Sequence, residues 1–342
     1  MTIGAYDTHT LMGVIAKQES LSSYWLDLCF PQVQLFETEY IDFDIVDRGK
    51  RLAPFVAPTV QGKPMLHEGY TTKRFKPAYV KPKDIVDPSR VIKRRPGEAY
   101  TGSLSQQQRY DAVVADILGE HSRLHRNRQE WMAAQAVING SITVSGESYP
   151  TTTISFGRAG GHTVTLGAGD RWNEAGVNPV QDLEDWALLM LQNSGTAATR
   201  VTMGIDAWKA FITNPLVKDQ LDVTYRGGAA ALDRGPNALI GGVYRGMLGS
   251  LEIYTYNDYY EDDTGAQTAI LGAKEVVLTG PGLQGVRCFG AIMDADAGFR
   301  PAEIFPKMWK QEDPSAIFLM TQSAPLMVPM RPNASFKATV LA

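Results

Sequence analysis

The 342-residue chain is poor in cysteine. Its two cysteines, Cys29 and Cys288, are too few for a disulfide framework or a four-cysteine zinc site. Cys29 could in principle serve as a nucleophile with a distant histidine, but its apolar flanks, Leu26, Leu28 and Phe30, favour a buried thiol. We therefore expect a reducing compartment, such as a cytoplasm, and thiols without a chemical role.

Long apolar runs are missing as well. The densest run, from Trp186 to Leu191, is far shorter than the ~20 residues that cross a bilayer. The segment from Met1 to Ser20 has no basic leader followed by an apolar stretch. The sequence therefore predicts no membrane contact and no export signal.

The chain has no excess of positive charge. It contains 33 Lys and Arg against 37 Asp and Glu, a formal charge of -4, so a surface built to coat itself with nucleic acid is disfavoured. Two basic runs, Arg90 to Arg95 and Arg123 to Arg128, could touch phosphate, although solvated or paired side chains are the commoner outcome. With 44% hydrophobic residues, the chain is long enough for about two compact units.

Catalytic and cofactor motifs are absent too. No phosphate-binding G-x-x-x-x-G-K-[ST], no dinucleotide G-x-G-x-x-G in its strand-to-helix context and no G-x-S-x-G elbow occurs. His121 and His125 lie four apart beside Glu120, but the order E-H-x-x-x-H is not that of a metalloprotease, and arginines surround it. A solvated helix face is favoured over a metal site. The Asp294 to Gly298 run lacks two ligands of a calcium loop and predicts a turn. We predict no enzyme, metal or cofactor.

Proline, in contrast, is abundant in one place. Seven of the 19 prolines fall between Pro54 and Pro96, which excludes a helix of useful length there. The pattern predicts two long edge strands joined around Gly62 to Gly69, forming a protruding arm. Because a two-stranded ribbon is marginal alone in water, the arm needs a surface to lie on, and a neighbouring subunit could supply it.

A long helix is predicted after this arm, where proline disappears. Ser103 and Gln106 form an S-x-x-Q capping signature, and apolar residues recur at helical spacing to a stop at Asn139-Gly140. A helix from Leu104 to Ile138 would be roughly 50 Å long at 1.5 Å per residue. It would cross the molecule as a spine.

The remaining chain predicts mixed α and β structure. Short antiparallel strands are expected between 141 and 169, and a helix capped by Asn178 should open at Pro179 and stop at Gly195. Further on we expect helices at 206–213 and from 215, strands at 200–203, 239–244, 251–256, 275–279 and 286–293, an exposed loop at 257–267, and two strands in the tail at 317–341.

Several segments resemble a known family. They are F-K-P-A-Y-V-K-P-K at 75–83, D-P-S-R-V-I-K-R-R at 87–95, I-M-D-A-D-A at 292–297, F-P-K-M-W at 305–309 and M-T-Q-S-A-P-L-M at 320–327. In combination they resemble the major capsid protein family of phage lambda, over about residues 24–342.

The resemblance implies a Hong Kong 97-type capsid fold of the α+β class. Its divisions here would be an N-terminal arm (1–47), an extended loop (48–100), a spine helix and peripheral domain (101–175, with 296–315 returning), and an axial domain (176–295, with 316–342 as closing strands). An enzyme with an unrecognised site and a nucleic-acid-binding module remain as alternatives from other classes.

The resemblance also implies partners and a location. Subunits would form hexamers and pentamers of an icosahedral shell that encloses double-stranded DNA without sequence-specific binding. Scaffold and portal proteins would take part in assembly, and relatives bind a decoration protein at three-fold points. The protein would be assembled in the host cytoplasm and reside in the virion, without covalent cross-links between subunits.

One cluster is our candidate for the contact between subunits. Between Glu68 and Asp84 every charged residue is basic, and like charges on one ribbon repel each other unless acids approach. We expect the cluster to dock on an acidic patch of an adjacent subunit, with two aromatic rings adding apolar contact. Its residues are Lys73, Arg74, Phe75, Lys76, Tyr79, Lys81 and Lys83.

Overall fold

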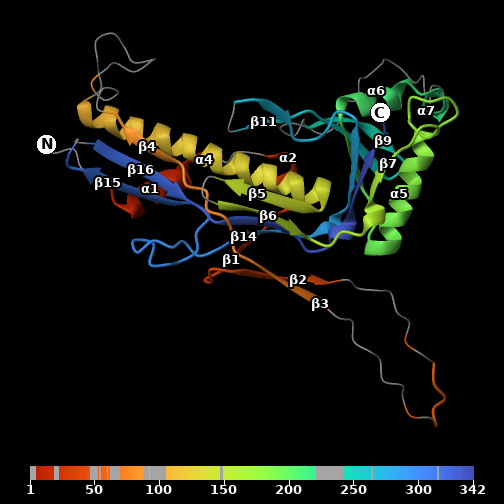
Figure 1. Cartoon of the computed structure of the whole chain (residues 1–342), viewed down its shortest axis with the longest axis horizontal. Coiled ribbons are helices and arrows are strands. Elements are labelled where there is room, and N and C mark those ends of the chain that lie inside the picture. The colour runs from red at the N-terminus through yellow and green to blue at the C-terminus, as the bar shows by residue number, and fades with distance from the viewer. Residues whose placement is uncertain are drawn as a thin grey trace, which may run out of the picture.

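A computed structural model describes most of the chain. The described residues are 5–18, 23–46, 53, 55–59, 61, 70–87, 92, 105–146, 149–220, 242–262, 265–313 and 316–342. They form an elongated body along one long helix, with a small sheet near one end of that helix and a larger, helix-covered sheet near the other (Figure 1). No helix in this part of the chain is long and apolar enough to cross a membrane.

The long helix, α4, runs from Gln106 to Asn139. It begins in a reciprocal capping box: the Ser105 hydroxyl accepts from the Gln108 amide at 3.2 Å, and the Gln108 side-chain oxygen accepts from the Ser105 amide at 2.8 Å. The spine helix is thus confirmed, but the prediction chose the wrong copy of a repeated S-x-x-Q motif. The copy that caps starts at Ser105 rather than at Ser103, which lies outside the described residues.

The C-terminal end of α4 depends on a residue from outside the helix. Gly140 adopts φ 65° and ends the helix, as predicted. No basic residue occupies the last turn, and Arg158 instead donates to the carbonyl oxygens of Val137 and Ile138, both at 2.8 Å. The guanidinium therefore satisfies two carbonyl groups that the helix leaves unpaired.

A three-stranded sheet covers the N-terminal half of α4. Its strand order is β15 (Phe305–Gln311), β16 (Ala316–Gln322) and β4 (Lys83–Val86), with every pairing antiparallel. Helix α1 (Thr8–Lys17) packs against α4 and β15 at this end of the molecule. The core between them consists of Leu11, Val86, Tyr110, Val113, Val114, Ile117, Leu118, Met308 and Leu319.

The central core lies along the second half of α4. A second three-stranded sheet joins β1 (Gln32–Leu35), β14 (Gly285–Phe289) and β17 (Pro325–Pro329). The hairpin β5 (Ser141–Gly146) and β6 (Tyr149–Ser155) confirms part of the prediction of antiparallel strands at 141–169. The third strand of that stretch, β7 (Thr163–Thr165), is instead parallel to its neighbour β18 (Ser335–Thr339) in another sheet.

Helix α2 (Tyr24–Cys29) is fastened to this core by a buried carboxylate. The two Glu130 oxygens accept from the Trp25 and Leu26 amides, both at 2.8 Å. Glu130 therefore links the N-terminal part of the chain to the spine helix.

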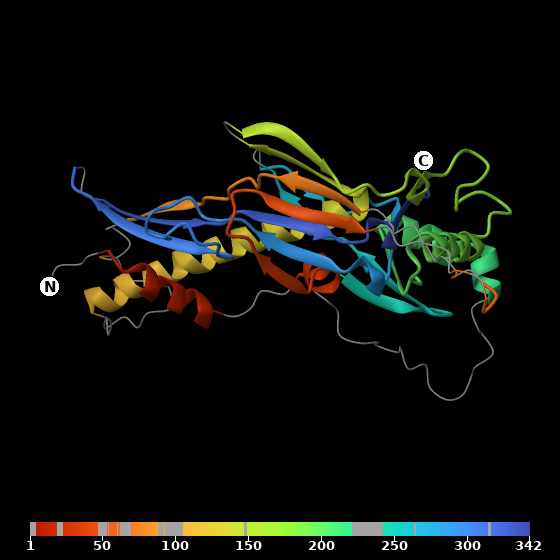
Figure 2. The same cartoon turned by 90° about the horizontal axis from the view of Figure 1, so that it is seen from below.

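A six-stranded sheet forms the opposite end of the molecule. Its order is β7 (Thr163–Thr165), β18 (Ser335–Thr339), β13 (Glu275–Thr279), β8 (Arg200–Met203), β10 (Leu251–Tyr256) and β9 (Gly242–Leu248). Figures 1 and 2 show helices at this end, namely α5 (Pro179–Ser194), α6 (Ile205–Thr213) and α7 (Pro215–Gln220). One 3-10 turn, η1 (Gly160–His162), leads into the sheet, and two others, η2 (Pro281–Leu283) and η3 (Pro332–Ala334), contact each other.

Several element predictions hold here and two are wrong. The Asn178 side chain accepts from the Val180 amide at the start of α5, and Gly195 ends that helix with φ 72°. The expected loop at 257–267 instead holds a hairpin of β11 (Tyr259–Glu261) and β12 (Gln267–Ala269). The tail forms three strands rather than two, because β16, β17 and β18 each join a different sheet.

The two-stranded ribbon predicted within the extended segment (residues 48–100) begins before that segment. Strand β2 (Ile41–Val46) pairs antiparallel with β3 (Tyr70–Phe75), whereas the described residues between 53 and 61 form no strand. In the sequence of β2, the buried Ile41 and Phe43 alternate with Asp42 and Asp44. Because aspartate is uncommon in strands, the sequence pattern did not predict a strand here. The ribbon's first strand thus lies in the segment that was predicted to be the N-terminal arm.

Candidate inter-subunit surface

The basic residues of β3 have partners within their own chain. The Arg74 guanidinium makes a two-bond fork with the Asp42 carboxylate, at 2.8 and 3.0 Å, directly across the β2–β3 ladder. This hydrogen bond lowers the pKa of Asp42. Lys76 forms an ion pair with Glu39, which raises the pKa of Lys76. The expectation that acids must come from another subunit is therefore wrong for Arg74 and Lys76.

Lys73 is held in a different way. Its ammonium donates to the Ser155 carbonyl oxygen of β6, so Lys73 fastens the β2–β3 ribbon to the β5–β6 hairpin. Of the seven residues predicted to meet a neighbour, three cations thus have a partner in their own subunit.

Lys81 and Lys83 are different, because both lie over aromatic rings. The Lys81 ammonium is 4.7 Å from the centre of the Tyr79 ring, and the Lys83 ammonium is 4.1 Å from that of Phe318. Both lysines are exposed, and no described carboxylate forms an ion pair with them. They remain the cations of the predicted cluster that are available to an acidic partner.

The two aromatic members of the cluster are turned toward their own subunit. Phe75 is half-buried against the central core. The Tyr79 hydroxyl donates to the Ala291 carbonyl oxygen at 2.6 Å and accepts from the Met293 amide at 3.2 Å. These contacts fasten the stem of the extended segment, residues 70–86, to the body.

Other apolar side chains are left uncovered on the extended segment. Phe55 is fully exposed, with 105% of the accessible area of a reference phenylalanine, and Ile92 is 69% exposed. Sequence reasoning missed Phe55, although a lone aromatic within a proline-rich extended stretch is a usable signal. On the edge strand β1, Val33 and Leu35 are also exposed. These side chains are candidates for a contact with another chain.

The remaining sequence candidates lie elsewhere. His121 and His125 are both fully buried, which corrects the prediction of a solvated helix face. Among the described residues no group of three His, Cys, Asp or Glu side chains could hold a metal. The turn at Asp294 is confirmed, because its carboxylate accepts from the Asp296 amide at 3.0 Å and from Lys307 at 2.9 Å. Cys29 is buried, as predicted, and burial raises the pKa of its thiol to about 12.

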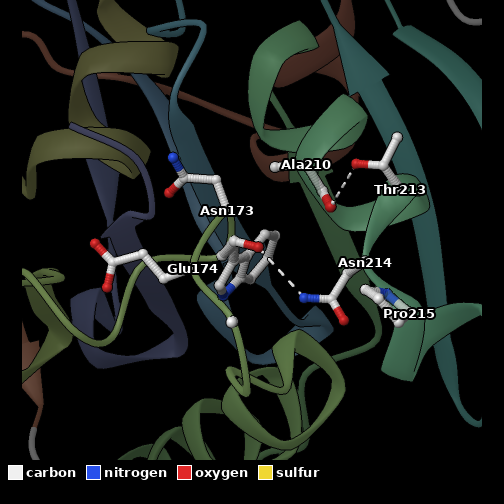
Figure 3. A pocket seen from close by; sticks show the side chains of 8 residues that line it. Asn173, Glu174, Ala210, Thr213, Asn214 and Pro215 are labelled. Atoms are coloured by element: carbon white, nitrogen blue, oxygen red, sulfur yellow. Dashed lines mark hydrogen bonds between the residues drawn. The ribbon is translucent and has the colours of Figure 1, made fainter.

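A shallow pocket of about 300 Å³ lies between α6 and the loop before α5 (Figure 3). The Asn214 side chain crosses it and donates to the Trp172 carbonyl oxygen at 3.3 Å. Its one carboxylate, Glu174, already accepts from the Gly169 amide. A catalytic site needs convergent titratable groups, and this pocket does not offer them.

The arrangement of the elements defines the class of protein. An extended ribbon, a long spine helix and a sheet near each end of that helix form a Hong Kong 97-type capsid fold. The crystal structure of a protein assigned to the capsid of an Escherichia coli CFT073 prophage shares it with a TM-score of 0.78, at 23% identity over 99% of this chain and 100% of that one. A phage-related protein of Bordetella bronchiseptica RB50 matches with a TM-score of 0.54, at 14% identity over 98% of this chain and 97% of that one.

The chain belongs to the family of phage major capsid protein E, which it matches over residues 7–340. It is 28% identical over 336 residues to the major capsid protein of Escherichia phage lambda, covering 96% of this chain and 97% of that protein. It is 29% identical over 331 residues to the P21 prophage-derived major head protein of Escherichia coli O6:H1, covering 95% and 96%. The protein is thus a major capsid protein of a tailed phage, a structural virion subunit rather than an enzyme.

Proposed function

We propose that the subunits form hexamers and pentamers of an icosahedral shell around double-stranded DNA, and that residues 48–100 overlap an adjacent subunit. The main support for this overlap is that Phe55 is fully exposed in the single subunit. An exposed aromatic side chain gains roughly 2 kcal/mol when a partner covers it. In a homopolymeric shell the available partner is a second copy of the same chain.

The charged part of the contact would rest on Lys81 and Lys83. Lys81 lies between β3 and β4, Lys83 is the first residue of β4, and neither has a described carboxylate as a partner. We propose that an acidic patch of the adjacent subunit faces them. Lys73, Arg74 and Lys76 would then act indirectly, by holding the ribbon at a fixed angle through their contacts within the subunit.

Substitution at Phe55 tests the apolar part of the proposal. We expect Phe55→Ser to leave the circular dichroism spectrum unchanged and to lower shell yield at least tenfold, while Phe55→Leu keeps most of it. Electron microscopy and sedimentation of the purified protein measure the yield. Normal shells from Phe55→Ser would contradict the proposed overlap.

Charge reversal tests the second part. Because exposed pairs contribute about 0 to 1 kcal/mol each, single changes should have little effect, whereas Lys81→Glu with Lys83→Glu should slow assembly in light scattering. Raising salt should slow the wild type toward the same rate, since the screening length falls to about 3 Å at 1 M. The control exchanges the internal pair, Glu39→Lys with Lys76→Glu, and should assemble normally. A double reversal that assembles like the wild type at low salt would refute the acidic patch.

The further partners and the domain division also remain part of this proposal. Scaffold and portal proteins would act during assembly in the host cytoplasm, and a decoration protein could bind at three-fold points. The peripheral domain would comprise 101–175 with 296–315, and the axial domain 176–295 with 316–342 as closing strands. Strand β16 departs from this division, because it pairs with β15 and not with the six-stranded sheet. Co-purification of assembly intermediates, followed by mass spectrometry, would test the partner set.

A further inference from the structure

Four side chains form a hydrogen-bonded relay between the spine helix and the stem of the extended segment. The His121 Nε2 atom lies 3.0 Å from an Asp84 oxygen, and its Nδ1 atom lies 3.2 Å from the Thr321 hydroxyl. That hydroxyl lies 2.8 Å from the His125 Nε2 atom. The members come from α4, β16 and β4, and both strands contact α4 (Figure 1).

The relay runs from solvent into the core. The Asp84 side chain is 54% exposed, whereas His121, His125 and Thr321 are fully buried. At the inner end the His125 Nδ1 atom has no hydrogen-bond partner. His162, also fully buried, differs because both its ring nitrogens have partners, the Ser335 carbonyl oxygen and the Asn193 amide.

The exposed carboxylate sets the direction of every bond in the relay. Ionised Asp84 can only accept, so the His121 Nε2 atom carries a proton and donates it. In a neutral ring the His121 Nδ1 atom then accepts from the Thr321 hydroxyl. The Thr321 oxygen in turn accepts from the His125 Nε2–H group. The His125 Nδ1 atom is left as a bare acceptor.

One additional proton cannot be accommodated in this arrangement. A proton on the His125 Nδ1 atom has no acceptor. A proton on His121 turns its Nδ1 atom into a donor, so Thr321 must donate to His125 instead, which moves the unpaired N–H to the same Nδ1 atom. If Thr321 accepts from both rings, its own O–H loses its acceptor. Each arrangement buries an unpaired donor, which costs free energy in the closed state.

We propose that this relay is an acid-sensitive latch, which holds β4 and the adjoining stem on the spine when the histidines are neutral and releases them when the pair takes up a proton. Release exposes the rings and lets water satisfy the additional donor. The inference does not depend on the proposed contact between subunits, because each member of the relay belongs to one chain.

Apart from Asp84, which pairs with His121 at the exposed end of the relay, no described charged group faces the two rings, and Asp84 does not contact His125. From β4 the group that faces the rings is Asp84, from β16 it is Thr321, and from α4 each histidine faces the other. The neighbouring Lys83 directs its ammonium to the Phe318 ring, and Arg126 of α4 pairs with Asp27. In agreement with this geometry, burial and the His121 ring lower the pKa of His125 to about 4.

Hydrogen exchange of the full-length protein at pH 7.5 and 4.5, corrected for the intrinsic rate, tests the latch. With a pKa near 6.5 in the open state and about 4 in the closed state, the opening equilibrium of residues 83–86 should rise on the order of 70-fold at pH 4.5. Strand β8, residues 200–203, serves as the internal control and should not change. A rise below threefold, or equal acceleration in β8, would overturn the proposal.

Two variants and one wild-type measurement complete the test. His125→Gln should abolish the acid response of 83–86, whereas His9→Gln, an exposed control, should retain it. A full response in His125→Gln would overturn the latch. If that variant fails to fold, exchange at the imidazole C2 position reports the titration of His125 in the wild type. Half-titration near pH 4 supports the latch, and half-titration near 6.5 refutes it.

Discussion

At the scale of single residues, a few buried polar groups stabilise the fold through contacts that the sequence pattern does not reveal. Arg158 lies 19 residues beyond Asn139, the last residue of α4, and still satisfies carbonyl oxygens in that helix's last turn. It also donates to the Thr163 hydroxyl at 2.7 Å, and burial lowers its pKa to about 10. The cost of burying a guanidinium is offset by these bonds and by the negative end of the helix dipole.

Replacing Arg158 should therefore destabilise the fold. We expect Arg158→Met, which keeps the stem and removes the donors, to lower the free energy of unfolding by about 2–4 kcal/mol. Urea denaturation followed by circular dichroism measures the change. The matched control is Arg123→Met, which removes an exposed pair with Glu120 on the same helix and should cost at most ~0.5 kcal/mol. Equal losses in both variants would disprove the capping role.

Glu130 should make the stability depend on pH in a defined direction. Burial raises its pKa above the unfolded value despite two amide donors. A raised carboxyl pKa means that the folded state binds the proton more tightly, so this group's contribution to stability grows as pH falls through the folded pKa. We expect the wild type to exceed Glu130→Gln in unfolding free energy by more at pH 5 than at pH 7.5, in paired urea titrations. A gap that narrows at pH 5 would contradict this assignment.

At the scale of elements, particular residues fix the two ends of α4. The capping box at Ser105 and the left-handed Gly140 fix where the helix begins and ends. A Cβ atom at Gly140 would approach the Arg158 Cβ atom to 2.9 Å, so the same position is constrained by conformation and by packing. Gly119 in the interior has no such constraint, since its Cβ position lies 3.5 Å from the Gln18 side chain.

The two glycines of the spine should thus respond in opposite directions to alanine. We expect Gly140→Ala to lower the free energy of unfolding by about 1–3 kcal/mol, through the left-handed strain and the contact with Arg158. Gly119→Ala should raise it by up to ~1 kcal/mol, because alanine is the better helix former. Thermal unfolding of both variants in one buffer makes the comparison. Changes of the same sign would show that the local backbone does not determine the outcome.

At the scale of the whole molecule, the extended segment divides into an anchored stem and an uncovered remainder. Residues 70–86 pair with β2 and β16, and Tyr79 bonds to the body. Deleting Lys63 to Lys81 would therefore remove β3 along with the segment that reaches outward, and would not separate folding from assembly. The cut that separates them lies between β2 and β3.

A shorter replacement should keep the fold and abolish assembly. Val46 pairs with Tyr70 at the end of the ladder, so residues 47–69 can be replaced by a two-residue Asn-Gly turn. We expect unchanged circular dichroism and monomers in sedimentation. Shells formed by this variant would show that the segment is dispensable for assembly, and loss of helix would show that it belongs to the fold of the subunit.

The sequence by itself determined the features that depend on local chemistry. Helical periodicity and Gly140 defined the spine, and Asn178 marked the start of α5. Combined motifs from Phe75 to Met327 were enough for the resemblance to a capsid family. These signals survive because each acts over a few residues, where backbone geometry and hydrogen bonding are decided nearby.

Only the tertiary structure decided which distant groups meet. Asp42 and Glu39 neutralise cations about 35 residues away, because β2 and its flanking turn place them beside the ribbon. The arginines near His121 and His125 predict that this helix face is solvated, but β16 and β4 cover it. No spacing in one chain indicates such a partner, since the sheet brings Thr321 and Asp84 together from segments more than 200 residues apart. Burial and pairing are properties of the assembled sheets, and so are the pKa values that follow from them.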